Sequence, residues 1–309
     1  MAEYIITNVG AARCLNIYGS NVTSLTNNQN VTLWQDSGTT EQVWEISSLG
    51  SNVKVKSVID KTFGLNAYRS GTNWNCDVLP ISGNDTDSAV TFEKSGDCYK
   101  IKLTNYTNRY LTAGGTGNGA NVYWAAATNA ENQLWDIEKR AIPASKTLTM
   151  PVNVSQSYSG NPDWIIDYGC GVCCQANLAS YYDKSRNYTI QDIIDCGAAA
   201  ENAGSYLGRT PKTSFKDFPG SNYINKIARQ INLGRPVLLH CKNTAGNEHW
   251  VVAFKYVNSC KTLSDIYVLD SAAGSSTSQV GAIRTLTASM AHNHNLTYVN
   301  NVKITREKK

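Results

Sequence analysis

The sequence lacks several features that would assign it to a broad class. The 309-residue sequence contains no run of eighteen apolar residues, so no segment is predicted to span a membrane. Charged residues make up 17% of the chain and the net charge is only +4, with no basic block before the last four residues, so nucleic-acid binding is not expected. The first residues lack the basic and apolar regions of a signal peptide. We expect a secreted protein whose signal has been removed, with a cytosolic location as the alternative.

The nine cysteines do not predict a disulfide framework. Their number is odd, so complete pairing would leave at least one free thiol. The length corresponds to about two domains, each large enough to bury a core without covalent crosslinks. No cofactor and no metal site is expected.

Residues 3–139 contain three similar segments, whose closing aromatic residues are Trp44, Phe92 and Trp135. Short alternating stretches such as 53–58 and 99–103 predict strands between turns rich in Gly, Asn, Ser and Thr, and helical periodicity is absent. A unit of four short strands cannot bury its apolar face alone, so the three units must share one core. An all-β domain is therefore predicted over residues 1–139.

The segment ends carry the motifs Gln42-x-Trp44 and Gln133-x-Trp135, with a degenerate copy that ends at Phe92. On these motifs the first half resembles the ricin-B-type β-trefoil lectins. The resemblance implies a trefoil fold, with each motif tryptophan in the core. It also implies shallow pockets that bind glycans or glycoproteins through polar residues and an aromatic platform, because the CH face of a sugar stacks on an aromatic ring.

The positions that match these pockets lie in the first and third segments. In the first segment they are Asn16, Trp34, Glu41 and Gln42. In the third they are Thr112, Trp124 or Tyr123 as the platform, Asn132 and Gln133. The middle segment offers only Asn66, and no site is expected there. The family usually has Asp where this chain has Asn16, Asn66 and Thr112, so a trefoil that serves only as a scaffold is the alternative.

Residues 140–150 break the repeat and are predicted to form a linker to a second domain, 151–309. Its patterns predict an α+β domain, in which helices precede antiparallel strands. Gly234 stands at the expected stop of the second helix, with Pro236 beyond it. The predicted helices span residues 170–183 and 222–233, and the predicted strands span residues 236–240, 249–254, 266–270 and 296–299.

Three positions of this second half have the residue types of a cysteine nucleophile with its base and orienter. Cys170 begins a predicted helix, whose unpaired N–H groups and positive dipole end stabilise a thiolate. His249 begins an apolar run and would complete the ion pair as an imidazolium. Asp270 ends a predicted strand and could accept the other ring N–H of the histidine.

The same order resembles the papain-like cysteine peptidases, most closely the group that includes the double-glycine leader peptidases. The resemblance covers about residues 151–285 and departs from the family at 172–174, where relatives commonly carry Pro and small residues. It implies that Gln156 donates its amide to an oxyanion beside the Cys170 N–H. It further implies a protein or peptide substrate, with no cofactor. The matching positions are Gln156 and residues 169–171, 234–237, 249–252 and 267–271.

Other interpretations of these residues remain open. Cys170-x-x-Cys173 could be half of a zinc site or a redox dithiol, although no second pair and no preceding βαβ pattern is present. Cys173 or Cys174 could be the nucleophile, but only Cys170 has glycines on both sides. His240 is interpreted as a strand residue without a role, and 292–294 as a solvated loop pair.

The two resemblances together imply a glycan-targeted cysteine peptidase that acts through an acyl-enzyme thioester. The alternative is a glycan-binding lectin or agglutinin. Its second domain would be inactive, or would perform transglutaminase-like or deamidase-like chemistry with the same three residues.

Overall fold

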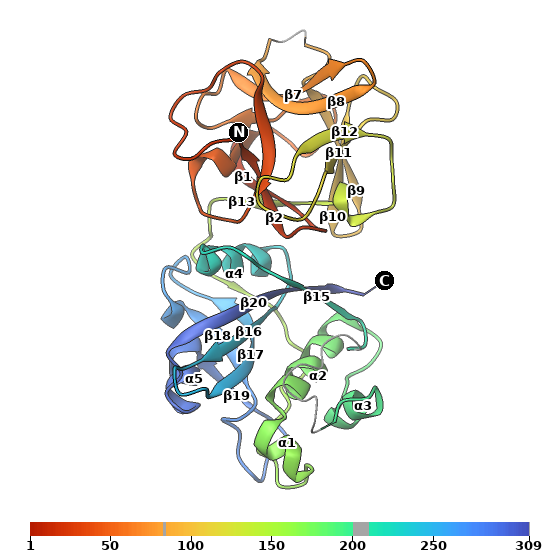
Figure 1. The fold of residues 1–309 in the computed structure, drawn as a ribbon. Coiled ribbons are helices and arrows are strands. Elements are labelled where there is room, and N and C mark those ends of the chain that lie inside the picture. The colour runs from red at the N-terminus through yellow and green to blue at the C-terminus, as the bar shows by residue number, and fades with distance from the viewer. Residues whose placement is uncertain (83–84, 200–209, 309) are drawn as a thin grey trace. The chain divides into compact units, whose positions relative to one another are not determined.

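The computed structural model describes residues 1–82, 85–199 and 210–308 (Figure 1). It is mostly β-structure, with five α-helices among the described residues. The chain divides into two compact units, the first comprising Met1–Ala141 with Pro219–Asn222, and the second comprising Ile142–Phe218 with Tyr223–Lys309. Within the described ranges, no helix has the length and apolar character needed to cross a bilayer.

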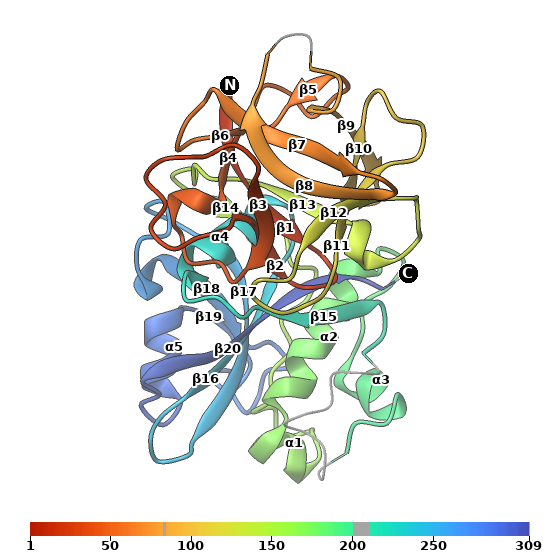
Figure 2. The same cartoon turned by 45° about the horizontal axis from the view of Figure 1, so that its top comes forward.

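The first unit is built on a 13-stranded sheet that closes on itself like a barrel (Figure 2). From β1 the pairing runs through β4, β6, β7, β8, β12, β11 and β10 to β13, and β13 pairs again with β1. Closure leaves no free edge in this circuit and buries one face of every strand. The strands are β1 Ala2–Asn8, β2 Arg13–Ile17, β3 Gln29–Trp34, β4 Val43–Ile46, β5 Val53–Lys54, β6 Lys56–Ser57, β7 Phe63–Ser70, β8 Asn73–Pro80, β9 Ala89–Ser95, β10 Cys98–Leu103, β11 Tyr110–Ala113, β12 Val122–Ala125 and β13 Trp135–Lys139.

The closing tryptophans of the first and third repeats occupy equivalent places in the core of this unit. Both side chains are fully buried. The Trp44 indole N–H donates to the carbonyl of Leu15 at 3.1 Å, and that of Trp135 donates to the carbonyl of Leu111 at 3.0 Å. Each bond satisfies a polar group that burial would otherwise leave unpaired.

Three asparagines connect the repeats in a ring. Asn30 donates its amide to Asn121 at 2.9 Å, Asn121 donates to Asn75 at 2.9 Å, and Asn75 donates to Asn30 at 2.8 Å. Each asparagine stands three residues before a core position of its repeat. The period of the sequence is therefore a threefold arrangement in space.

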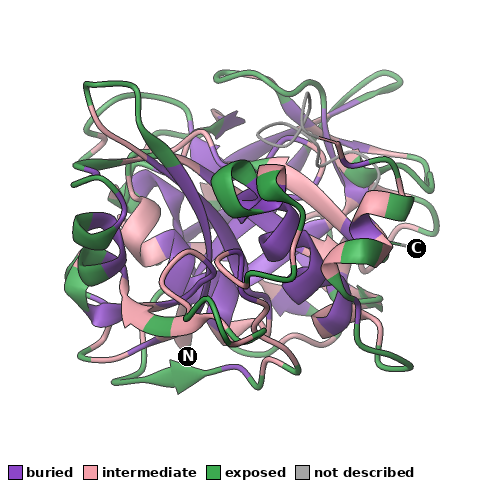
Figure 3. Ribbon diagram, turned by 90° about the horizontal axis from the view of Figure 1, so that it is seen from below, coloured by how far each residue is buried: buried purple, intermediate pink, exposed green. Residues whose placement is uncertain are grey.

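The second unit contains an antiparallel sheet in the order β15-β20-β16-β17-β18-β19, with β14 paired to β17. Its central strands and α2 are largely buried, and exposed positions fall mainly in loops and on the outer helices (Figure 3). The strands are β14 Lys146–Thr147, β15 Thr213–Asp217, β16 Val237–Lys242, β17 Glu248–Tyr256, β18 Ile266–Asp270, β19 Ala282–Thr285 and β20 Tyr298–Glu307. The helices are α1 Asp163–Tyr168, α2 Cys170–Tyr182, α3 Ile190–Asp195, α4 Tyr223–Asn232 and α5 Leu286–His292.

Two expectations from the sequence differ from the structure in this unit. Residues 140–150 are not an independent linker, because β14 adds to the sheet and Leu148 is buried in its core. The strand predicted at 296–299 begins at Tyr298 and continues to Glu307. Polar and apolar residues alternate irregularly along this strand, so the sequence pattern did not predict its full length.

Candidate functional site

Cys170 lies where α1 ends and α2 begins, and Gly169 makes this junction possible. A Cβ atom at Gly169 would lie 2.5 Å from the carbonyl oxygen of Ile165, so a side chain there would collide with the backbone. Gly169 is the N-cap of α2, and Cys170 is the first residue of that helix. The N–H groups of a first helical turn lack intrahelical partners. Its side chain is 9% exposed and faces a cavity of about 450 Å³ that Gln156 and His249 also line.

His249 connects Cys170 to Asp270. Its Nε2 atom is 3.0 Å from Asp270 Oδ1, and the Cys170 thiol lies near enough to the ring to influence its pKa. Burial of the ring lowers the pKa of His249, but the interactions with Asp270 and Cys170 outweigh this effect and raise the pKa to about 9. Since Nε2 faces the carboxylate, Nδ1 is the nitrogen available to the thiol. At neutral pH this arrangement favours an imidazolium beside Cys170.

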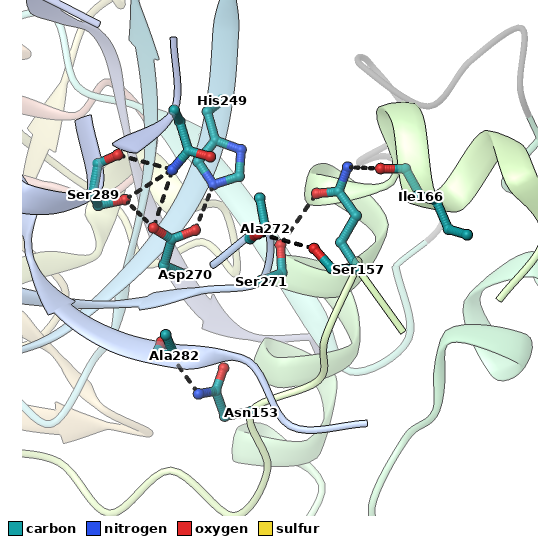
Figure 4. A network of polar contacts seen from close by, with 11 residues as sticks. Asn153, Ser157, Ile166, His249, Asp270, Ser271, Ala272, Ala282 and Ser289 are labelled. Carbon is teal, nitrogen blue, oxygen red and sulfur yellow. Dashed lines mark hydrogen bonds and ion pairs between the residues drawn. The ribbon is translucent and has the colours of Figure 1, made fainter. Parts of the chain in front are cut away.

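Asp270 is fully buried at the end of β18, and two residues of α5 and its C-cap hold its second oxygen (Figure 4). Asp270 Oδ2 accepts a hydrogen bond from Ser289 Oγ at 2.7 Å and another from Asn293 Nδ2 at 3.0 Å. Burial raises the pKa of Asp270, but the bonds from His249, Ser289 and Asn293 lower it below its ordinary value. The carboxylate is therefore ionised and fixed. Sequence reasoning missed Ser289 and Asn293, for which no motif gave a signal.

Gln156 lies on the segment that precedes α1, and the loop after Asp270 holds it there. Its backbone N–H donates to the Ser271 carbonyl at 3.0 Å, and its side-chain Nε2 donates to the Ile166 carbonyl at 2.8 Å. The neighbouring Ser157 hydroxyl donates to the Ala272 carbonyl at 2.9 Å. An amide NH₂ has two hydrogens, so one remains after the bond to Ile166. The residues that directly follow Asp270 thus hold Gln156 in place.

Cys173 and Cys174 are buried away from the cavity. Their exposed fractions are 0% and 1%, and burial raises the pKa of both thiols far above the ordinary value. All nine cysteines, each of them described, are free thiols, so Cys170 and Cys173 are not joined. No group of three or more His, Cys, Asp or Glu suited to a metal ion was found in the described ranges.

The remaining histidines lie closer to the cavity than the sequence suggested. His292 and His294 both line its wall, together with Glu248 and Trp250. His240 stacks on the Trp250 ring with centroids 4.1 Å apart and planes inclined by 2°, and its Nε2 lies 3.2 Å from Glu248 Oε2. The histidine predicted to have no role thus supports one wall of the cavity through Trp250.

A second cavity, of about 390 Å³, lies in the first unit. Asn16, Trp34 and Glu41 line it together with Tyr18, and the Trp34 side chain is 40% exposed. Glu41 Oε1 accepts a hydrogen bond from the Val22 N–H at 2.8 Å. Three of the four residues predicted for the first segment therefore lie together around one hollow.

Gln42 supports this cavity from behind. It is fully buried and does not line the hollow. Its Nε2 donates to the Gln35 carbonyl at 2.7 Å, and its Oε1 accepts from the Ser37 N–H at 3.0 Å. These bonds fix the loop that follows Trp34.

In the third segment the assignment of Trp124 as the aromatic platform is wrong. Trp124 is 2% exposed, and its indole N–H donates to the Asn66 carbonyl at 3.2 Å, so neither face is open to a sugar. The register explains the error. Leu111 faces Trp124 as Leu15 faces Leu33, which places Ala125 at the position equivalent to Trp34. A shift of one residue moves a side chain to the other face of a strand.

The other predicted residues of the third segment do lie together. Gln133 Nε2 donates to Thr112 Oγ1 at 2.9 Å, and both side chains are buried. Asn132 Nδ2 donates to the Ala113 carbonyl at 3.3 Å. Tyr123 is half-buried and faces Thr112 across the strand pair. This cluster has polar groups but no aromatic residue at the platform position.

No protein-family model and no curated protein matches the chain. Solved structures that resemble part of it include the designed threefold-symmetric protein ThreeFoil, with 20% identity, a TM-score of 0.39, and coverage of 44% of this chain and 96% of that chain. The C-half of an earthworm R-type lectin in complex with GalNAc gives 17% identity, a TM-score of 0.36 and coverages of 45% and 99%. A ricin B-like lectin from Macrolepiota procera in complex with lactose is 17% identical, with a TM-score of 0.37 and coverage of 44% of this chain and 94% of that chain. These similarities are too low to assign a function to this chain.

Proposed function

We propose that the chain is a carbohydrate-binding protein and that the Trp34 cavity is its glycan site. The observation that carries this proposal is the 40% exposed face of Trp34 on the wall of a hollow that Asn16 and Glu41 also line. An open indole face suits the apolar side of a pyranose, and fixed amide and carboxylate groups suit its hydroxyls. The resemblance to ricin-B-type β-trefoil lectins supports the same function.

We further propose that the second unit transfers acyl groups through Cys170, with hydrolysis of peptide bonds as the leading chemistry. The thiolate would attack the carbonyl carbon of an amide, and His249 would protonate the departing amine as the C–N bond breaks. The thioester that remains would then react with water, whose proton passes to His249 as the C–S bond breaks. Gln156 and the Cys170 N–H would stabilise the oxyanion in both steps. The bond between His249 and Asp270, together with the position of Cys170 and His249 on the wall of one cavity, carries this proposal.

A carbohydrate-binding protein with a non-proteolytic second unit is the competing proposal, and two observations favour it. Cys170 is only 9% exposed, and the Gln156 amide already donates to the Ile166 carbonyl. A site of this kind would need a small movement before it could accept a peptide. Transamidation and deamidation also remain compatible with the three residues, because they share the thioester step.

Alkylation by iodoacetamide at mildly acidic pH separates these proposals. A cysteine nucleophile that is paired with a histidine is alkylated much faster than a thiol without such a partner. We expect rapid, single-site labelling of Cys170 and its loss in His249→Ala. Slow labelling of Cys170 in the folded protein would favour the non-catalytic second unit. Incubation of labelling-competent protein with a peptide library, with and without an added amine, then distinguishes hydrolysis from transamidation.

A further inference from the structure

The middle repeat of the first unit carries an unusual group of side chains at the end of a hairpin. Its strands β7 and β8 have eight residues each (Figure 2). The equivalents of β7, which are β2 and β11, have five and four residues, and the equivalents of β8, which are β3 and β12, have six and four. In this extension Arg69 is paired directly with Trp74 across the hairpin. Cross-strand partners project to the same face, so both side chains lie on one side.

Two guanidinium groups approach the same indole. The Cζ atom of Arg69 is 5.2 Å from the centroid of Trp74, and that of Arg109, from the residue before β11, is 4.9 Å from it. Tyr106 packs edge-on against the same ring, with centroids 4.8 Å apart and planes at 77°. Trp74 is only 9% exposed, so the ring is a fixed platform for both cations.

The two arginines have hydrogen-bonding capacity to spare. Arg69 Nε donates to the Gly71 carbonyl at 3.4 Å and Arg109 Nη1 donates to the Asn108 carbonyl at 3.3 Å. Among the described residues no carboxylate forms an ion pair with either arginine, although other cations of this unit are paired, as in Lys61–Glu45 and Arg140–Glu3. A guanidinium has five N–H donors, and two like charges beside one ring repel each other. An anion bound there would satisfy the donors and remove the repulsion.

The same repeat lacks the features of the Trp34 cavity. Leu79 occupies the position equivalent to Trp34, because Leu65 faces Val78 as Leu15 faces Leu33. The Asn66 amide donates to Asp77 Oδ1 at 2.9 Å within the buried interior. A neutral sugar therefore has no comparable platform in this repeat, and the hairpin extension offers positive charge instead.

We propose that Arg69 and Arg109 bind the sulfate or carboxylate group of an acidic glycan, with Trp74 and Tyr106 as the apolar floor beneath it. Arginine suits these groups because its planar fork donates two parallel hydrogen bonds to an oxyanion. The identity of the ligand as a glycan rests on the proposed carbohydrate binding. The residues are distinct from those of the Trp34 cavity, so either site can be absent without the other.

Calorimetric titration of the full chain at low salt tests this site with matched probes, namely lactose, sulfated lactose, sialylated lactose and inorganic sulfate. We expect the acidic lactoses to bind roughly tenfold or more tightly than lactose, since a charge-assisted hydrogen bond contributes enough for one such factor. Arg69→Gln/Arg109→Gln should lose this preference. The control Lys94→Gln/Lys139→Gln removes the same two charges from exposed positions of the same unit and should retain it.

Several outcomes would overturn the proposal. The first is a preference for acidic lactoses that survives in Arg69→Gln/Arg109→Gln, and the second is an equal loss of that preference in the lysine control. The third is that the protein binds inorganic sulfate but neither acidic lactose. The fourth is arginine-dependent binding of a short single-stranded DNA that is tighter than binding of the acidic lactoses. Trp34→Ala separates the two sites. If it abolishes all lactose binding but an acidic ligand still binds through Arg69 and Arg109, the second site stands alone. If the acidic lactoses bind no more tightly than lactose while lactose binds through Trp34, only the second site is refuted.

Discussion

Leu111 and Trp124 face each other across β11 and β12 in the register that pairs Leu15 with Leu33 in the first repeat. This register leaves Trp34 exposed and Trp124 buried, so the two tryptophans have different roles. Trp34→Ala should abolish glycan-array binding with little change in the free energy of unfolding. Trp124→Ala should cost about 3–5 kcal/mol, because it leaves a cavity in the core. Urea unfolding and array binding of both variants check this, and an unchanged array profile for a folded Trp34→Ala protein would contradict it.

Cys170 and Cys173 differ in their access to the cavity, although they are one helical turn apart. Cys170→Ala should eliminate turnover and iodoacetamide labelling, because no other thiol lines the cavity among the described residues. Cys173→Ala should retain most of the activity, since its thiol is fully buried and protonated. Mass spectrometry of the labelled peptides and a turnover assay distinguish the two. A Cys170→Ala protein that turns over substrate as well as the parent would refute the mechanism.

Gln156 should affect the rate rather than the fold. Loss of one oxyanion donor typically lowers kcat by about a hundredfold or more, so Gln156→Ala should do so with little change in KM. Gln156→Glu serves as a control of similar size that cannot donate in its ionised form. If the alanine variant is as active as the parent, the oxyanion is stabilised elsewhere and the Gln156 amide only anchors Ile166.

Ser289 and Asn293 should act through the orientation of Asp270. Asn293→Ala removes one of two bonds to Asp270 Oδ2, so the carboxylate gains freedom and holds His249 less firmly. We expect a fall in kcat of roughly tenfold for either single variant and more for the double variant, in line with typical outer-shell effects. A structural role alone would change the melting temperature and leave the pH profile of labelling in place. A shifted profile in a stably folded Asn293→Ala protein is the expected result.

The sequence predicted those features that depend on local patterns. The aromatic period locates the repeats, and the residue types at a helix start, in β17 and at the end of β18 indicate Cys170, His249 and Asp270 as one group. Register was harder, because Tyr123 and Trp124 are adjacent and only strand pairing decides which one is buried. The contacts of Ser289 and Asn293 with Asp270 depend on where a short helix packs, and no spacing in the sequence encodes that position.

The raised pKa of His249 predicts how stability should depend on pH. Its pKa in the folded protein is about 9, above the ordinary value of 6.5, so the folded state binds the proton more tightly than the unfolded state. The resulting stabilisation is complete below about pH 6.5 and is lost as the pH rises through about 9. The difference in the free energy of unfolding between the parent and His249→Gln should therefore be largest near pH 6 and shrink toward pH 9.5. Urea titrations across this range measure the difference. Asp270→Asn is the matched control, because without the carboxylate the slope should largely disappear, and a difference that stays constant with pH would contradict the imidazolium assignment.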